Sequence, residues 1–238
     1  STALKGAGIL FLMRIAAMAP QSLFAGMLPA LGAATMIFGS LLALRQERLG
    51  RLLAYSSIAH AGTLILGVGA WAAQGAAPAA AAPLFFYLAA YLLMSNGAFI
   101  FLKASGLSAR AELLGYAKTH PLPAGLFAIL LLALAGVPPT GGFTSKLLIF
   151  WEAVKCGFYG PLAGAGLASL IALSYYLGLI RAMYFEEPID GTASGSESPH
   201  TLSGNILAYG VVGFCALGAL ALGLCPWFVA RIYGVLGA

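Results

Sequence analysis

The sequence predicts an all-α membrane protein with about seven transmembrane helices. The first observation is composition: of 238 residues, 61% are hydrophobic and only 8% are charged, whereas soluble domains have about 25% charged residues. So few charges cannot cover a surface that faces water. The second observation is that apolar stretches of roughly 20 residues, the length of a transmembrane helix, follow one another along the chain. Lipid is therefore expected to surround most of this protein.

The predicted helices follow these apolar stretches in order. The first stretch already reads as the inside of a helix and lacks the charged region and cleavage site of a signal peptide. We therefore expect residues 1–238 to form a single transmembrane domain that is a fragment of a longer protein. The expected spans are residues 2–19, 22–44, 52–72, 83–104, 122–154, 159–185 and 205–233.

The fifth stretch, residues 122–154, is too long for one regular span and contains the run VPPTGG at residues 137–142. Proline removes a backbone donor and clashes with the preceding turn, and glycine weakens a helix further. We predict two half-helices, with a break at Pro138 and Pro139 in mid-membrane. Backbone at that depth is tolerated only where it is buried in protein or lines a water-filled cavity.

The charges of the short connections predict the orientation in the membrane. Two connections are basic, which places them in the cytoplasm, whereas the uncharged connection 73–82 is expected outside. By alternation, the flexible connection 186–204 lies inside and the C-terminus outside. Residues 109–120 are expected to form a short interfacial helix. The basic residues are Arg45, Arg48 and Arg51 in the first connection and Lys103, Arg110 and Lys118 in the second. This placement also explains the net charge of +5 without a nucleic-acid partner.

Lys146 is the first candidate for chemistry, because ionisable residues inside spans are rare and are often functional. It follows the predicted break by a few residues, so it lies where backbone groups are freed and water can enter. Burial disfavours the charged form of an amine, so a lysine at this depth can gain and lose a proton at neutral pH. The alternative is a structural lysine that pairs with a carboxylate.

His60 is the second candidate and lies in the middle of the third predicted span. Imidazole titrates near physiological pH and can accept a proton on one nitrogen and release one from the other. Ser56, Ser57 and Thr63 lie within a turn and can hold a chain of water molecules. Gly62 leaves room for close helix packing or for water. The alternative is a core histidine with a satisfied hydrogen bond.

Lys5 is either a second buried amine or an interfacial lysine that flanks the first span. Arg14 and Arg181 lie near span ends and are interpreted as interfacial, and Glu152 can pair with Lys155. The residues expected to line a channel or to form the helix break are Ser56, Ser57, Pro138, Pro139, Thr140 and Thr144. A further group either lines the channel or makes helix–helix hydrogen bonds: Tyr87, Tyr91, Ser95, Asn96, Ser174, Tyr175 and Tyr176.

Cys156, Cys215 and Cys225 form no CxxC pattern and have no histidine nearby at metal-ligand spacing, so we interpret them as small packing residues. No glycine-rich dinucleotide turn and no haem-ligand spacing is present. We therefore expect no metal and no cofactor in this chain.

Three motifs indicate a family. They are RLLAYSSIAHAG at residues 51–62, GVPPTGGFTSK at residues 136–146 and STALK at residues 1–5. In these motifs the chain resembles the antiporter-like membrane subunits of respiratory NADH–quinone oxidoreductase (complex I), most closely the subunit N branch. The chain departs from the family pattern at Leu4, where proline is usual, and at Thr63, where tyrosine is frequent.

The resemblance implies a subunit of about fourteen helices, built from two inverted five-helix repeats that each contain a broken helix. This chain would be the C-terminal half, with the second repeat at residues 22–185 and a final helix at 205–233. The family's N-terminal glutamate–lysine pair is not in it. The resemblance also implies that Lys5, His60 and Lys146 form a proton relay, from a central lysine through a histidine to a lysine on the broken helix.

The function implied by the resemblance is proton translocation coupled to electron transfer from NADH to quinone. NADH, FMN, the iron–sulfur clusters and quinone would belong to partner subunits. The expected partners are the other membrane subunits of complex I, including sister antiporter-like subunits, and lipid; the expected location is the inner (plasma) membrane. Two alternatives stay open: a subunit of a Mrp-type monovalent cation/proton antiporter or membrane-bound hydrogenase, and a half-subunit with only a packing role.

Overall fold

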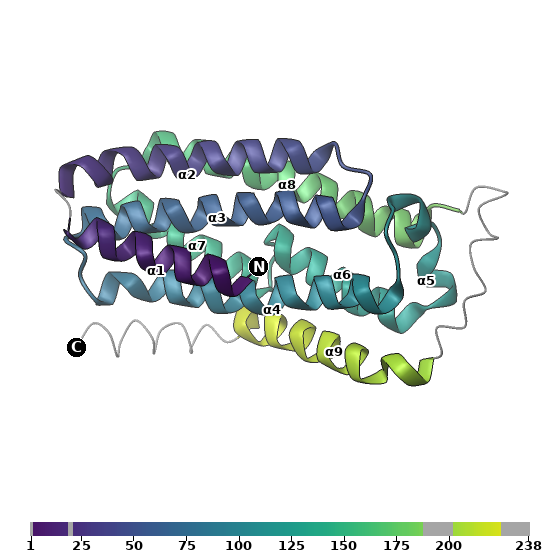
Figure 1. Ribbon diagram of the computed structural model, residues 1–238. Coiled ribbons are helices and arrows are strands. Elements are labelled where there is room, and N and C mark those ends of the chain that lie inside the picture. Colours follow the sequence, from purple (N-terminus) through teal and green to yellow (C-terminus); the bar gives the residue numbers. More distant parts are fainter. Residues whose placement is uncertain (1, 19–20, 188–201, 225–238) are drawn as a thin grey trace.

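The computed structural model describes residues 2–18, 21–187 and 202–224, and these residues are almost entirely helical (Figure 1). The long helices run side by side along one axis of the bundle. In chain order the elements are α1 (Thr2–Met18), α2 (Gln21–Leu44), α3 (Leu49–Ala73), η1 (Ala79–Ala81), α4 (Ala82–Ser105), η2 (Arg110–Leu113), α5 (Tyr116–Thr119), α6 (Pro121–Ala135), α7 (Gly141–Lys155), α8 (Tyr159–Phe185) and α9 (Leu202–Leu224).

Within the described residues, five helices are long and apolar enough to cross a membrane: α2, α3, α4, α8 and α9. The other two predicted spans correspond to α1, with 17 residues, and to the pair α6 and α7, with 15 residues each. Each of these three helices is shorter than the roughly 20 residues of a full span. Most of the predicted 186–204 connection, and residues 225–233 of the predicted final helix, lie outside the described residues.

The predicted helix break is present. α6 ends at Ala135, Gly136 follows with the left-handed φ of 83°, and α7 begins at Gly141. Glycine takes this backbone conformation without the steric penalty of a side chain. The Thr140 hydroxyl donates to the carbonyl of Val137 at 2.7 Å, which fixes the turn between the two half-helices. The break at Pro138–Pro139 is therefore confirmed.

Helices α2 and α3 pack closely along their length (Figure 1). A Cβ atom at Gly62 would lie 2.6 Å from the carbonyl oxygen of Gly32, so only glycine permits this approach. The expectation that Gly62 allows close helix packing is confirmed. On another side of the bundle, α9 packs against α4, α6 and α7, so it covers the region of the helix break.

The two basic connections lie together at one end of the bundle. The backbone N–H of Leu49 donates to Ser108 at 2.9 Å, and that of Arg110 donates to Glu47 at 2.9 Å. The prediction of one interfacial helix over residues 109–120 is wrong, because the segment forms two short helical turns, η2 and α5, instead of a single helix. Gly115, with a φ of 68°, interrupts it between them.

Candidate functional site

Lys146 lies in the second turn of α7 and is 8% exposed. Its Nζ donates to the carbonyl oxygens of Leu134 at 3.1 Å and Ala135 at 3.0 Å. These carbonyls belong to the last turn of α6, where a helix leaves its acceptors without partners and carries partial negative charge. Among the described residues, Lys146 makes no salt bridge. The last turn of α6 therefore places partial negative charge next to this amine.

His60 lies on α3 and is 4% exposed. Its Nδ1 is 2.7 Å from the hydroxyl of Tyr87 on α4, and which atom donates depends on the tautomer. The imidazole ring also lies 5.0 Å, between ring centroids, from the ring of Tyr91. One nitrogen is thus held by a tyrosine, which leaves Nε2 for another partner.

Lys5 on α1 reaches the same region. Its Nζ donates to the carbonyl oxygen of Ser57 at 2.9 Å and to the hydroxyl of Tyr91 at 3.0 Å. The amine also lies 5.3 Å from the centroid of the Tyr91 ring, within the range of a cation–π contact. Tyr91 therefore contacts both Lys5 and His60, and Lys5 lies among helices α3 and α4.

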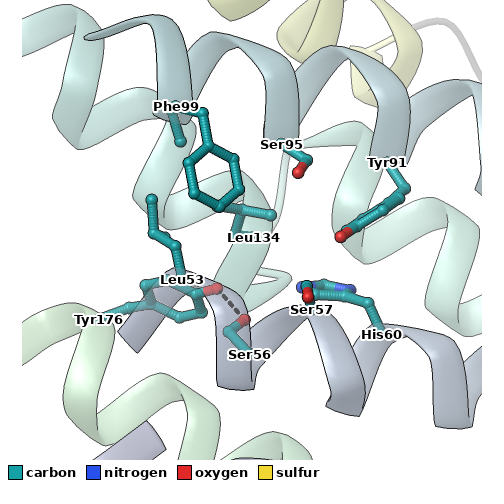
Figure 2. A pocket seen from close by; sticks show the side chains of 10 residues that line it. Leu53, Ser56, Ser57, His60, Tyr91, Ser95, Phe99, Leu134 and Tyr176 are labelled. Carbon is teal, nitrogen blue, oxygen red and sulfur yellow. Dashed lines mark hydrogen bonds between the residues drawn. The ribbon is translucent and has the colours of Figure 1, made fainter. Parts of the chain in front are cut away.

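A small cavity opens between α3, α4, α6 and α8 (Figure 2). Figure 2 shows His60 and Ser57 on one side and Tyr91 and Ser95 on the other. The volume is ≈ 10 Å³, which is about the space of one water molecule. A hydrogen bond between Ser56 and Tyr176 closes one end. The residues that line the cavity are Leu53, Ser56, Ser57, His60, Tyr91, Ser95, Ala98, Phe99, Leu134 and Tyr176.

A second cavity of ≈ 10 Å³ also has His60 in its wall and is lined by Lys146 as well. Helices α2 and α8 supply most of its remaining wall. His60 thus lines both cavities, and the second one joins the histidine to the lysine of the broken helix. The residues that line it are Met36, Ser40, Ser56, Ala59, His60, Thr63, Lys146, Ala168, Ser169, Ala172 and Tyr175.

The other predicted site residues have simpler roles in the structure. Pro138 and Pro139 are exposed in the turn between α6 and α7. The hydroxyl of Thr144 lies 3.5 Å from the carbonyl oxygen of Thr140, and that of Ser57 donates to its own helix at Ala54. The two prolines and the two threonines shape the break and line neither of the two cavities.

Sequence reasoning missed Ser40 and Ser169, which line the second cavity from α2 and α8. A single serine in an apolar helix is too common to stand out, so no signal pointed to either residue. Ser174, considered as channel lining, is instead exposed and bonds to its own helix at 2.7 Å.

The expected pairing of Glu152 is confirmed: its carboxylate accepts from Lys155 at 2.7 Å, and it also accepts from Gln74 on α3 at 2.9 Å. Of the acidic, histidine and cysteine residues that the structure describes, no group of three or more could hold a metal ion.

The fold and the polar residues define a multi-pass membrane protein with a buried lysine and a buried histidine in its interior and a second, half-buried lysine beside them. Residues 1–172 match the model of the NADH:quinone oxidoreductase/Mrp antiporter transmembrane family. The chain belongs to this family.

The curated relatives that it matches include proteins named NADH-quinone oxidoreductase subunit N. The protein from Opitutus terrae is 37% identical over 217 residues, which is 89% of this chain and 41% of the relative. The protein from Sorangium cellulosum is 40% identical over 204 residues, which is 80% of this chain and 40% of the relative. The chain thus spans about 40% of the length of these relatives.

Solved structures give the same fold. A chain of respiratory complex I from Thermus thermophilus, with bound aureothin, is 34% identical with a TM-score of 0.67, over 92% of this chain and 46% of that one. A chain of the Mrp complex from Dietzia sp. has a TM-score of 0.76 at 22% identity, over 96% of this chain and 50% of that one. The second match concerns the fold alone.

Proposed function

We propose that this chain is the proton-conducting C-terminal half of a subunit N of NADH–quinone oxidoreductase, with Lys5, His60 and Lys146 as its relay. One observation carries the proposal: the three side chains, from α1, α3 and α7, are linked through Tyr91 and through the cavity that His60 and Lys146 share. A buried relay needs titratable groups at short intervals, with water or hydroxyl groups between them.

In this proposal, protons move by changes in the charge of neighbouring groups. A positive charge on Lys5 disfavours a second positive charge on His60, and a charged His60 disfavours one on Lys146. A conformational or charge change in a partner subunit would therefore shift the proton along the line. The Leu134 and Ala135 carbonyls hold Lys146 while it is charged and release it when it is neutral, because a neutral amine attracts the α6 terminus less.

The number of membrane spans, the bounds of the repeat and the orientation in the membrane belong to the same proposal. Helices α6 and α7 would together cross the membrane as one broken span, and with α1 this gives seven spans. Residues 22–185 would form the five-helix repeat, and the final helix would follow at 205–233. The pairing of the two basic connections at one end of the bundle supports placing both in the cytoplasm. The C-terminus would then lie outside the inner membrane.

Redox chemistry would belong to partner subunits that hold NADH, FMN, the iron–sulfur clusters and quinone. The partners would be the other membrane subunits of complex I, sister antiporter-like subunits among them. The relatives at 37% and 40% identity carry the subunit N name, which favours this assignment over a Mrp-type antiporter. Purification of the native assembly distinguishes the two, because only complex I would contain flavin and iron–sulfur subunits.

The test is the substitution Lys146→Met in the full-length subunit within its assembled complex. NADH–quinone turnover and proton uptake into membrane vesicles are measured together. The matched control is Lys103→Met, which removes an exposed lysine at the end of α4. The proposal predicts that Lys146→Met lowers both activities in an assembled complex while the control leaves them unchanged. Normal pumping in an assembled Lys146→Met complex would refute it.

A further inference from the structure

Helix α9 meets the turn of the broken helix backbone to backbone. Gly223 lies in the last turn of α9. A Cβ atom there would lie 2.6 Å from the Cα atom of Thr140 and would also meet the carbonyl oxygen of Pro139. From the other side, a Cβ atom at Gly141 would lie 2.9 Å from the Cβ atom of Leu222. Rotation of a side chain relieves none of these contacts, so a larger residue at Gly223 must move α9 and the turn apart.

The turn that α9 contacts joins the donor and the acceptors of the Lys146 hydrogen bonds. Thr140 immediately precedes α7, and Lys146 lies in the second turn of that helix. The acceptors are the carbonyl oxygens of Leu134 and Ala135, at 3.1 and 3.0 Å, in the last turn of α6. A displacement of the turn therefore changes the distance between the amine and these oxygens.

Helix α9 is itself held along α4 (Figure 1). A Cβ atom at Gly97 on α4 would lie 2.7 Å from the Cβ atom of Cys215 on α9, so this contact also depends on a glycine. The same helix α4 carries Tyr91, which contacts His60 and Lys5. Helix α9 thus fixes the turn relative to the helix that contacts the other two groups of the proposed relay.

We propose that Gly223 is a positioning residue for proton transfer, because it lets α9 rest on the turn between α6 and α7 and so holds Lys146 at the end of α6. This inference rests on the proposed function. Gly223 acts through the backbone of the turn and not through a side chain of its own. A misplacement of about 1 Å in a reacting group can lower a rate about 100-fold, so a small shift of the turn is enough to slow transfer at Lys146.

The experiment compares Gly223→Ala with two other glycine changes on α9, in the full-length subunit within its intact complex. A Cβ atom at Gly210 meets nothing within 4 Å, so Gly210→Ala is the matched control. A Cβ atom at Gly218 would lie 3.1 Å from the side chain of Leu93 on α4, so Gly218→Ala disturbs the packing of α9 away from the break. Assembly and the rate of proton uptake into membrane vesicles are measured for each. If Gly223→Ala does not assemble, Gly141→Ala, whose Cβ atom meets α9 from the other side, takes its place.

A second measurement separates positioning from packing. Gly223→Ala is combined with Lys146→Arg, and the fold-losses in the rate of uptake are compared. If α9 acts through Lys146, Gly223→Ala slows uptake in the otherwise unmodified subunit but has little further effect once Lys146 is changed. A general loss of stability would slow uptake by the same factor in both backgrounds.

We expect Gly223→Ala to lower the rate of proton uptake at least about tenfold, near the low end of what one hydrogen bond from a charged group contributes, while Gly210→Ala and Gly218→Ala keep the unmodified rate. An unchanged rate in Gly223→Ala, an equal loss in Gly218→Ala, or an undiminished effect of Gly223→Ala beside Lys146→Arg overturns the inference. Lys146→Met separates the two proposals. If it abolishes uptake while Gly223→Ala does not slow it, only the role of Gly223 fails; if it has no effect, the relay and the role of Gly223 both fail.

Discussion

Gly142→Ala should separate the two halves of the broken helix. A Cβ atom at Gly142 would lie 1.8 Å from the carbonyl oxygen of Ala133 in α6, whereas ordinary contact begins at 3.4 Å. Because that neighbour is helix backbone, α7 must move away from α6 by more than 1 Å. The two hydrogen bonds from Lys146 to α6, at 3.1 and 3.0 Å, would then exceed the limit for a hydrogen bond.

The expected destabilisation has two parts. Overpacking typically costs about 1–3 kcal/mol, and each of the two hydrogen bonds lost from a charged group adds about 1.5–3 kcal/mol, so a loss of at least about 4 kcal/mol is expected. The assay is the thermal midpoint of the full-length subunit in its purified complex. Gly166→Ala on α8 is the control: a Cβ there meets nothing within 4 Å, and alanine favours a helix over glycine by up to about 1 kcal/mol. The same midpoint in Gly142→Ala as in Gly166→Ala would refute the reasoning.

Two further changes test single contacts. Tyr87→Phe leaves the buried His60 Nδ1 without its partner at 2.7 Å, so we expect a destabilisation of about 1–3 kcal/mol, measured as a lower thermal midpoint. At the basic end, the backbone N–H of Ser108 holds the pKa of Glu112 below its usual value of 4.5. This carboxylate therefore stabilises the fold at pH above 4.5 and loses its effect as pH falls through the lowered pKa. Glu112→Gln should lower the free energy of unfolding at pH 7 by less than about 1 kcal/mol, because the group is mostly exposed. This appears as a lower thermal midpoint, and the difference from the unmodified protein should vanish in acid.

The helices could be predicted from the sequence because each depends on local signals. Apolar stretches of span length located the long helices, and the run VPPTGG at residues 137–142 located the break. The prediction of one short helix over residues 109–120 failed, because Gly115 has a left-handed backbone conformation that divides the segment. A glycine in a short polar segment does not by itself indicate that conformation. Local sequence patterns thus predicted the long helices. They did not predict the interruption at Gly115, which depends on the backbone conformation of one residue.

The contacts of the candidate site could not be predicted, because they join residues far apart in the sequence. Lys146 was identified by its place after the break, yet nothing local indicated that the end of α6 would accept its N–H groups. The second cavity brings together Ser40 and Tyr175, from α2 and α8. Such a meeting depends on helix packing, which in turn depends on close approaches such as that of Gly32 and Gly62.

The most direct test of the account is whether His60 and Lys146 act on one proton path. The rate of proton uptake into membrane vesicles is measured for His60→Gln, Lys146→Arg and the double variant in the full-length subunit within its assembled complex. Both changes keep a hydrogen-bonding side chain, so measurable transport is expected to remain. If the two residues serve one path, their effects are coupled, and the double variant should be about as slow as the slower single variant. If the two fold-losses multiply, the residues act independently and the proposed relay is contradicted.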